Sequence, residues 1–216
     1  MNLQKPEPEK KPGNRFFKYL PAFAAFCFFA LSFVAILLYP GGTQIDPDTT
    51  GFSWQHNYWC ELLNSEASNG KPNPGMPFAA IGMCFLGVSM SAFFYSLPVY
   101  CPTTKGQQMI VRFCSLIAST FACLLFTGYH HVMLLGFSIF TFLTILTALI
   151  ILAEARQHLS FSAGLMVFLM IQGNNLIYYL NWHKEILPWF QKLTIFLTAF
   201  WVVWLSLRLK DPTCRD

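Results

Sequence analysis

The chain contains six apolar runs, each long enough to cross a lipid bilayer as a helix. A helix needs about 20 residues to cross a hydrocarbon core that is about 30 Å thick. Backbone groups in lipid must be hydrogen-bonded within their own segment, and the runs lack the alternation of barrel strands. The sequence therefore predicts an all-α fold, a six-transmembrane-helix bundle. The runs are residues 23–39, 77–97, 109–127, 132–152, 161–180 and 187–207.

The composition is typical of a membrane protein rather than a soluble domain. Apolar residue types make up 55% of the chain and charged types only 11%, which is far from the balance of soluble proteins. The small basic excess is explained by membrane topology, so we expect membrane lipids as partners and no nucleic acid. The seven cysteines form no recognisable disulfide framework, and those within spans are expected to be small apolar packing residues.

Lysine and arginine fall mainly on one side of the predicted bundle, which carries both termini. The positive-inside rule then places both termini in the cytoplasm. We expect a multi-pass protein of the cell membrane, in a bacterium the inner membrane. Residues 1–18 are proline-rich and charged, and they are predicted to be a disordered cytoplasmic tail. Residues 19–209 form the single six-helix domain, and residues 210–216 form a second cytoplasmic tail.

The first outer loop, residues 41–75, contains a pattern that suits a short amphipathic helix at the membrane interface. Bulky side chains alternate there with polar ones in the stretch FSWQHNYWCELL, from Phe52 to Leu63. One interpretation is a belt of aromatic side chains that caps the bundle. The other is a lid, in which His56, Asn57 and Glu61 point toward a pocket between the spans.

The fifth span carries an amide-rich stripe in the outer half of the membrane, within LMIQGNNLIYYL. Gln172, Asn175 and Tyr179 share one helical face, and Asn174 lies on an adjoining stripe. Amides facing lipid would be costly, so they should face protein or water. They either form hydrogen bonds between helices or line a polar cavity that binds a substrate headgroup together with Asn57.

Two adjacent histidines, His130 and His131, occupy the short turn between the third and fourth spans, in FTGYHHVM. Adjacent residues of a helix point about 100° apart, so the two imidazoles should face different surroundings. Together with His56 and His183 they are candidate ligands of a zinc ion that activates water. No HExxH or comparable spacing supports that site, and the alternative is two ordinary polar residues at the membrane boundary.

Several short motifs resemble a bacterial family of small polytopic membrane proteins called domain of unknown function 998. They are Pro40-Gly41 after the first span, the pattern in NYWCELL, Asn73-Pro74 before the second span and a histidine in the second outer turn. The chain departs from that family at Cys60, Glu61 and Leu63, where the family has serine, aspartate and glycine. The resemblance implies a six-helix integral membrane protein, loosely similar to Frag and DRAM-type proteins and so to a lipid-related setting.

Two functional hypotheses follow. The first, which we favour, is a non-enzymatic, lipid-associated or accessory membrane protein whose polar residues serve packing and topology. The second is a metal-dependent lipid hydrolase or transferase at the outer membrane boundary. In that case Glu61 would be the general base and His130 a general acid or metal ligand. A transporter is disfavoured because no acidic residue lies clearly in mid-membrane.

Overall fold

The structure, a computed structural model, describes residues 15–127, 129–181 and 184–209. Its long helices are α1 (Arg15–Leu38), α2 (Met76–Tyr100), α3 (Lys105–Cys123), α4 (His130–Glu154), α5 (His158–Leu180) and α6 (Leu187–Arg208). Two short 3-10 helices, η1 (Trp59–Leu63) and η2 (Lys184–Ile186), lie in the connections. The described residues form no β-strand, only isolated bridges such as Gly41 with Thr50. The all-α prediction is confirmed.

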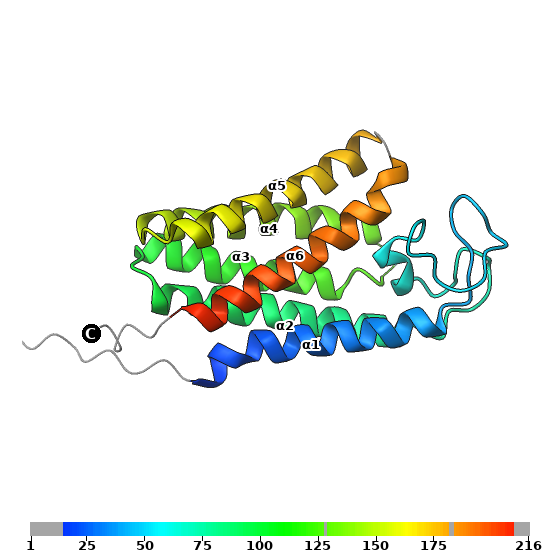
Figure 1. The fold of residues 1–216 in the computed structure, drawn as a ribbon, viewed down its shortest axis with the longest axis horizontal. Helices are drawn as coiled ribbons and strands as arrows, with labels where there is room; N and C mark the ends of the chain where they lie inside the picture. Colours follow the sequence, from blue (N-terminus) through cyan, green and yellow to red (C-terminus); the bar gives the residue numbers. More distant parts are fainter. Residues whose placement is uncertain (1–14, 128, 182–183, 210–216) are drawn as a thin grey trace, which may run out of the picture.

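The helices form a bundle in which each packs against the next along the chain, and α6 also contacts α1. The start of α1 and the end of α6 lie at the same end of the bundle (Figure 1). The long loop between α1 and α2, with η1, lies at the other end (Figure 1). α1 begins at Arg15, inside the segment predicted as a tail, because the apolar pattern extends back through Phe16 and Tyr19.

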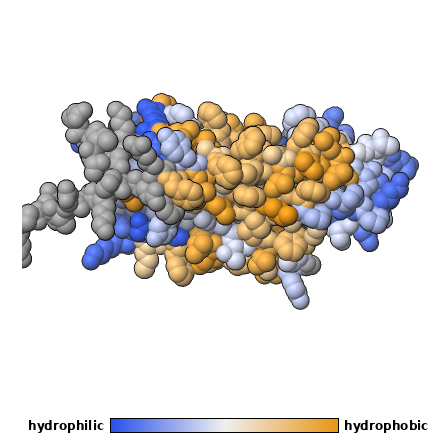
Figure 2. Space-filling view, turned by 90° about the horizontal axis from the view of Figure 1, so that it is seen from below, coloured by the Kyte–Doolittle hydropathy of each residue, from blue (hydrophilic) through white to orange (hydrophobic). Residues whose placement is uncertain are grey.

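Five of these helices are long and apolar enough to cross a membrane: α1, α2, α4, α5 and α6 with η2. An apolar band covers the middle of the molecule, with more hydrophilic surface at both ends (Figure 2). These features suit a multi-pass membrane protein. The remaining helix, α3, has 19 residues and begins with the polar stretch KGQQ, and Arg112 follows in its third turn. Its crossing of the membrane stays a prediction.

The helices approach each other most closely where one of them carries a small residue. Gly164 of α5 is the clearest case, because a Cβ there would lie 2.6 Å from the Trp201 ring. The Trp201 indole in turn donates a hydrogen bond to the backbone carbonyl of Ser160 at 3.1 Å. Around Trp201, buried side chains of α2, α4 and α6 form one apolar core, with Leu97, Leu152 and Leu205 each fully buried.

A second core lies at the loop end of the bundle and includes residues of the first loop. Phe28 of α1 stacks on Trp59 of η1 with ring centroids 5.7 Å apart, and Leu62 is fully buried beside them. Asn73 joins this segment to the stretch that leads into α2, because its Nδ2 donates to the carbonyls of Leu62 and Asn64 at 3.2 and 3.0 Å. The loop is therefore packed into the bundle.

The helix predicted for residues 52–63 is present only in its last part, as the 3-10 helix η1 (Trp59–Leu63). The preceding residues form turns. The reason is that the Asn57 side chain accepts the backbone N–H of Ser53 at 2.7 Å, and such local side-chain bonds compete with helix formation. Whether η1 lies in a membrane interface stays a prediction.

Candidate functional site

Asn57 is the most deeply buried polar residue of the first loop, with a side chain that is 0% exposed. Its Nδ2 donates to the backbone carbonyl of Gly42 at 2.8 Å and to Oε2 of Glu61. Gly42 has a φ of +83°, and a Cβ there would lie 2.3 Å from the backbone nitrogen of Asn69. Only glycine fits this position. The turn after α1 thus supplies the carbonyl that Asn57 needs.

Glu61 lies beside Asn57 and is 5% exposed. Its Oε1 accepts a hydrogen bond from Nε2 of Gln44 at 3.3 Å, and its Oε2 accepts from Asn57. Burial raises the pKa of the Glu61 carboxyl because it penalises the charged form, and the two amides and the charge of Lys192 offset part of that effect. Since Glu61 is almost fully buried, a substrate would reach it as a general base only if the loop opened.

Lys192 of α6 supplies the matching positive charge and is only 3% exposed. Its Nζ donates to the backbone carbonyl of Asn57 at 2.5 Å and to that of Pro188 at 3.1 Å. The same nitrogen lies 5.4 Å from the centroid of the Phe52 ring, a cation–π contact. A buried ammonium is tolerated only when it is hydrogen-bonded and its charge is balanced, and the first loop provides both.

The neighbouring residue, Gln191, makes a second connection between α6 and the loop. Its Oε1 accepts the backbone N–H of Trp59 at 2.8 Å, and its Nε2 lies 4.0 Å from Sγ of Cys60. Burial raises the pKa of the Cys60 thiol to about 11, with a smaller contribution from the charge of Glu61. A thiol of that kind is a poor nucleophile near neutral pH.

We call Asn57, Glu61, Gln191 and Lys192 the loop clamp. Its members hydrogen-bond to one another or to backbone groups across the loop and α6. A satisfied buried network of this kind specifies one arrangement of the segments that it joins. The clamp therefore holds the first loop in one position on the first turns of α6.

The two histidines at the start of α4 face different partners. His130 Nδ1 lies 3.0 Å from the backbone carbonyl of Leu125, within its own turn. His131 Nδ1 lies 3.0 Å from the hydroxyl of Tyr178 on α5. The ring centroids of the two imidazoles are 6.1 Å apart. The two imidazoles thus have different partners, and which of them faces the membrane interface stays a prediction.

The candidate zinc ligands do not come together in the part of the chain that the structure describes. No group of three or more histidine, cysteine, aspartate and glutamate side chains there could hold a metal ion. The backbone of His56 donates to Oγ of Ser53 at 3.3 Å, within the loop. His183 lies outside the described residues. The proposed hydrolase residues Glu61 and His130 are engaged separately, one in the loop clamp and the other in its turn.

The amide stripe of α5 divides between two neighbouring helices. Asn174 Nδ2 donates to Oγ1 of Thr194 on α6 at 2.5 Å. Asn175 Oδ1 accepts from Oγ of Ser138 on α4 at 3.1 Å. Gln172 has a buried Nε2 without a partner, and Tyr179 is 47% exposed. The two asparagines thus form hydrogen bonds between helices, and neither of these bonds involves Asn57.

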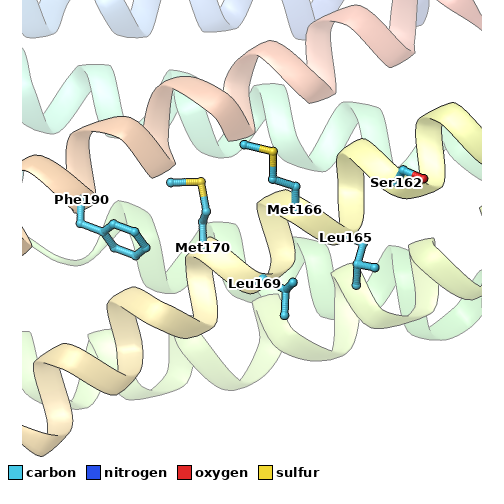
Figure 3. Close-up of a pocket in the computed structure, with 6 residues that line it drawn as sticks. All are labelled: Ser162, Leu165, Met166, Leu169, Met170 and Phe190. Carbon is cyan, nitrogen blue, oxygen red and sulfur yellow. The ribbon is translucent and has the colours of Figure 1, made fainter.

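An open apolar groove with a volume of about 450 Å³ lies beside α5. Figure 3 shows Met166 and Met170 projecting from α5 on the side of α6, with Phe190 reaching toward Met170 from α6. Phe190 lies against Gly173, where a Cβ would come 2.9 Å from its ring. The groove is lined by Ser162, Leu165, Met166, Leu169, Met170 and Phe190.

The loop clamp determines where one side of this groove lies. Phe190 directly precedes Gln191 and Lys192, and both of those side chains are bonded to the first loop. About one turn after Phe190 on α6, Thr194 accepts a hydrogen bond from Asn174, which ties α5 to α6. Polar contacts thus fix the spacing of two helices whose facing surfaces are apolar.

Comparisons of the chain with protein-family models, with curated proteins and with solved structures found no match. The resemblance to domain of unknown function 998 therefore stays a prediction, carried by its short motifs alone. Two of those motifs have clear structural roles here, because the side chains of Asn57 and Asn73 both donate hydrogen bonds to backbone carbonyls within the first loop.

Lys192 was not among the site residues predicted from the sequence. A lysine in the second turn of an apolar span is the signal that could have singled it out, because a charge at that depth needs a partner. Its partner could have been sought among the carboxylates of the same side, including Glu61. The groove was also missed, because its residues are ordinary lipid-facing types.

Proposed function

We propose that this chain is a non-enzymatic, multi-pass membrane protein that holds the hydrocarbon chain of a membrane lipid in the groove beside α5. The observation that carries the proposal is the groove itself, with its lining of Leu165, Met166, Leu169, Met170 and Phe190. Its volume of about 450 Å³ lies within the range of about 300–1,000 Å³ that is typical of ligand sites. Methionine side chains adapt to irregular apolar ligands.

The position of the groove supports a ligand that arrives from the bilayer. α5 has the smallest buried share of the five span-like helices, 17% against 39% or more for the others. Side chains such as Leu169 and Met166 are 60% and 53% exposed. A lipid chain can enter such a surface laterally, whereas a ligand from water would have to cross the apolar band.

The metal-dependent hydrolase has weaker support. Its two catalytic candidates lie in separate networks, with Glu61 bonded to Asn57 and Gln44 and His130 bonded to a carbonyl of its own turn. The contacts that these residues make fasten the loop and the turn. They suit the accessory role better than acid–base chemistry on one substrate.

The lipid proposal can be tested on protein purified from membranes in a mild detergent. Lipid that stays with the protein through repeated detergent exchange is quantified by mass spectrometry and expressed per chain. The double variant Met166→Trp, Met170→Trp fills the groove. We expect it to retain severalfold less lipid than the wild type, because the indole rings occupy the space of the hydrocarbon chain.

The matched control is Leu37→Trp, a tryptophan on the outer surface of α1, where Leu37 is 69% exposed. This variant should retain as much lipid as the wild type. Equal retention by the wild type, the control and the groove-filled variant would show that lipid binds without using the groove, and the proposal would then be wrong.

A further inference from the structure

Helices α2 and α3 pack along a seam of small residues. Ser119 of α3 donates from Oγ to the backbone carbonyl of Gly87 on α2 at 3.0 Å, and Ser91 donates to Oγ of Ser119 at 2.7 Å. A Cβ on Gly87 would lie 3.3 Å from Sγ of Cys123. The two helices run in opposite directions, so lower numbers on α2 face higher numbers on α3.

This register places two cysteines opposite each other. Cys84 lies three residues before Gly87 on α2, and Cys123 lies four residues after Ser119 on α3, so each is one turn further along the same seam. The two thiols are close enough to interact electrostatically. Both are free thiols in the structure. The pair belongs neither to the loop clamp nor to the groove.

The surroundings of Cys84 limit which oxidants could reach it. Cys84 is exposed and lies on α2 between two exposed apolar residues, Ile81 and Val88, which are 51% and 45% exposed. It is eight residues from the first residue of α2, Met76, or about 12 Å along the helix axis. If α2 crosses a membrane, this position lies in hydrocarbon, where water-soluble disulfides do not dissolve and quinones do.

We propose that Cys84 and Cys123 are a redox-active dithiol that a membrane quinone oxidises to a disulfide. Two S–H bonds break and one S–S bond forms between the helices. The two electrons and two protons released pass to the quinone, which leaves as the hydroquinone. The balance matches the two-electron, two-proton chemistry of a benzoquinone, and no further reactant is needed.

The disulfide would join α2 to the last residue of α3. Cys123 ends that helix, and the turn that follows contains Leu125, which is 7% exposed and whose carbonyl accepts from His130. Oxidation would therefore hold the end of α3 and the turn leading to α4 against α2. The proposal is independent of lipid binding beside α5.

The test uses the full chain in lipid vesicles with duroquinone, a tetramethyl benzoquinone that has no free ring position to alkylate a thiol. After incubation, free thiols are alkylated and the protein is digested and analysed by mass spectrometry. We expect Cys84 and Cys123 to lose alkylation together and to appear as one linked peptide, lighter by two hydrogen atoms. A reducing agent should restore both thiols, and hydroquinone should form in equal amount to the link.

Three internal comparisons make the result specific. Cys114, also on α3, should stay fully alkylated in the same sample. In Cys84→Ser the thiol of Cys123 should stay alkylated after quinone treatment, and in Cys123→Ser that of Cys84 should. Full alkylation of both cysteines in the quinone-treated wild type would overturn the proposal, and so would a link from either one to a different cysteine. A link formed by copper–phenanthroline and not by duroquinone would overturn the assignment to a quinone.

Discussion

The ammonium group of Lys192 donates a hydrogen bond to the backbone carbonyl of Asn57, 135 positions earlier in the chain. This contact joins α6 to the loop that follows α1. The contact places a positive charge next to the network that contains Glu61. It also holds the turn of α6 from which Phe190 reaches into the groove (Figure 3). One buried lysine thus connects the first loop with the surface proposed to hold lipid.

Replacing Lys192 by methionine should strongly destabilise the protein. The change removes both bonds of Nζ and leaves the buried Glu61 carboxyl without its positive neighbour. Leaving a buried backbone carbonyl without its donor costs about 1–3 kcal/mol for each carbonyl. The free energy of unfolding, measured by denaturant titration in detergent, should fall by that amount. Lys71→Met is the control, because Lys71 is exposed, and an equal loss in both variants would contradict the role of the clamp.

Glu61 should impose a defined pH dependence on stability. Burial raises the pKa of Glu61 in the folded protein above the ordinary value of 4.5. At a pH between the pKa of the unfolded state and that of the folded state, the folded state therefore binds more protons than the unfolded state. Stability therefore falls as the pH rises through this window, with a slope of at most about 1.4 kcal/mol per pH unit, and is flat above it.

The control for the pH dependence of stability is the variant Glu61→Gln, because a glutamine side chain does not titrate. The difference in the free energy of unfolding, wild type minus variant, should decrease as the pH is raised from about 4.5 and then level off. Other carboxyls such as Asp46 and Glu66 are present in both proteins and cancel in the difference. A difference that stays constant would show that folding does not raise the pKa of Glu61, and a difference that grows with pH would show that Glu61 is stabilised as the charged form.

Cys60 should react slowly with alkylating reagents although it lies in a loop. With its thiol pKa raised to about 11, the thiolate fraction at pH 8 is on the order of a hundred times smaller than for an ordinary thiol. The rate of N-ethylmaleimide addition, followed peptide by peptide, should be lower by a similar factor than that of Ser65→Cys. Ser65 is an exposed position in the same loop. Comparable rates at the two sites would mean that Cys60 is accessible and ionises normally.

Substitution of Gly164 by alanine should disturb the packing of α5. The added Cβ would lie 2.6 Å from the Trp201 ring, and overpacking of this kind costs about 1–3 kcal/mol. The melting temperature in detergent should fall clearly. Gly106→Ala is the matched control, since the nearest atom to its Cβ lies 3.9 Å away. A melting temperature unchanged in Gly164→Ala would show that α5 can move away freely.

Part of the candidate site could be predicted from the residues alone. Asn57 and Glu61 were expected to point toward a pocket between the spans in one of the two interpretations of the loop. The two side chains are buried and hydrogen-bonded to each other, and the pocket stays a prediction. His56, expected with them, makes its backbone bond within the loop, and the amides of α5 face α4 and α6 rather than the loop. Spacing along one segment predicts which side chains share a face, but it does not predict which other segment that face meets.

The sequence by itself determined that this is an all-α chain with helices long and apolar enough to span a membrane, because length and hydropathy along one segment are local properties. Only the tertiary structure decided that Lys192 would meet Asn57, that Cys84 would face Cys123, and that Phe190 would close one side of a groove. These pairs join residues far apart in the chain. Their contacts depend on how helices pack through small residues and on which buried polar groups find partners.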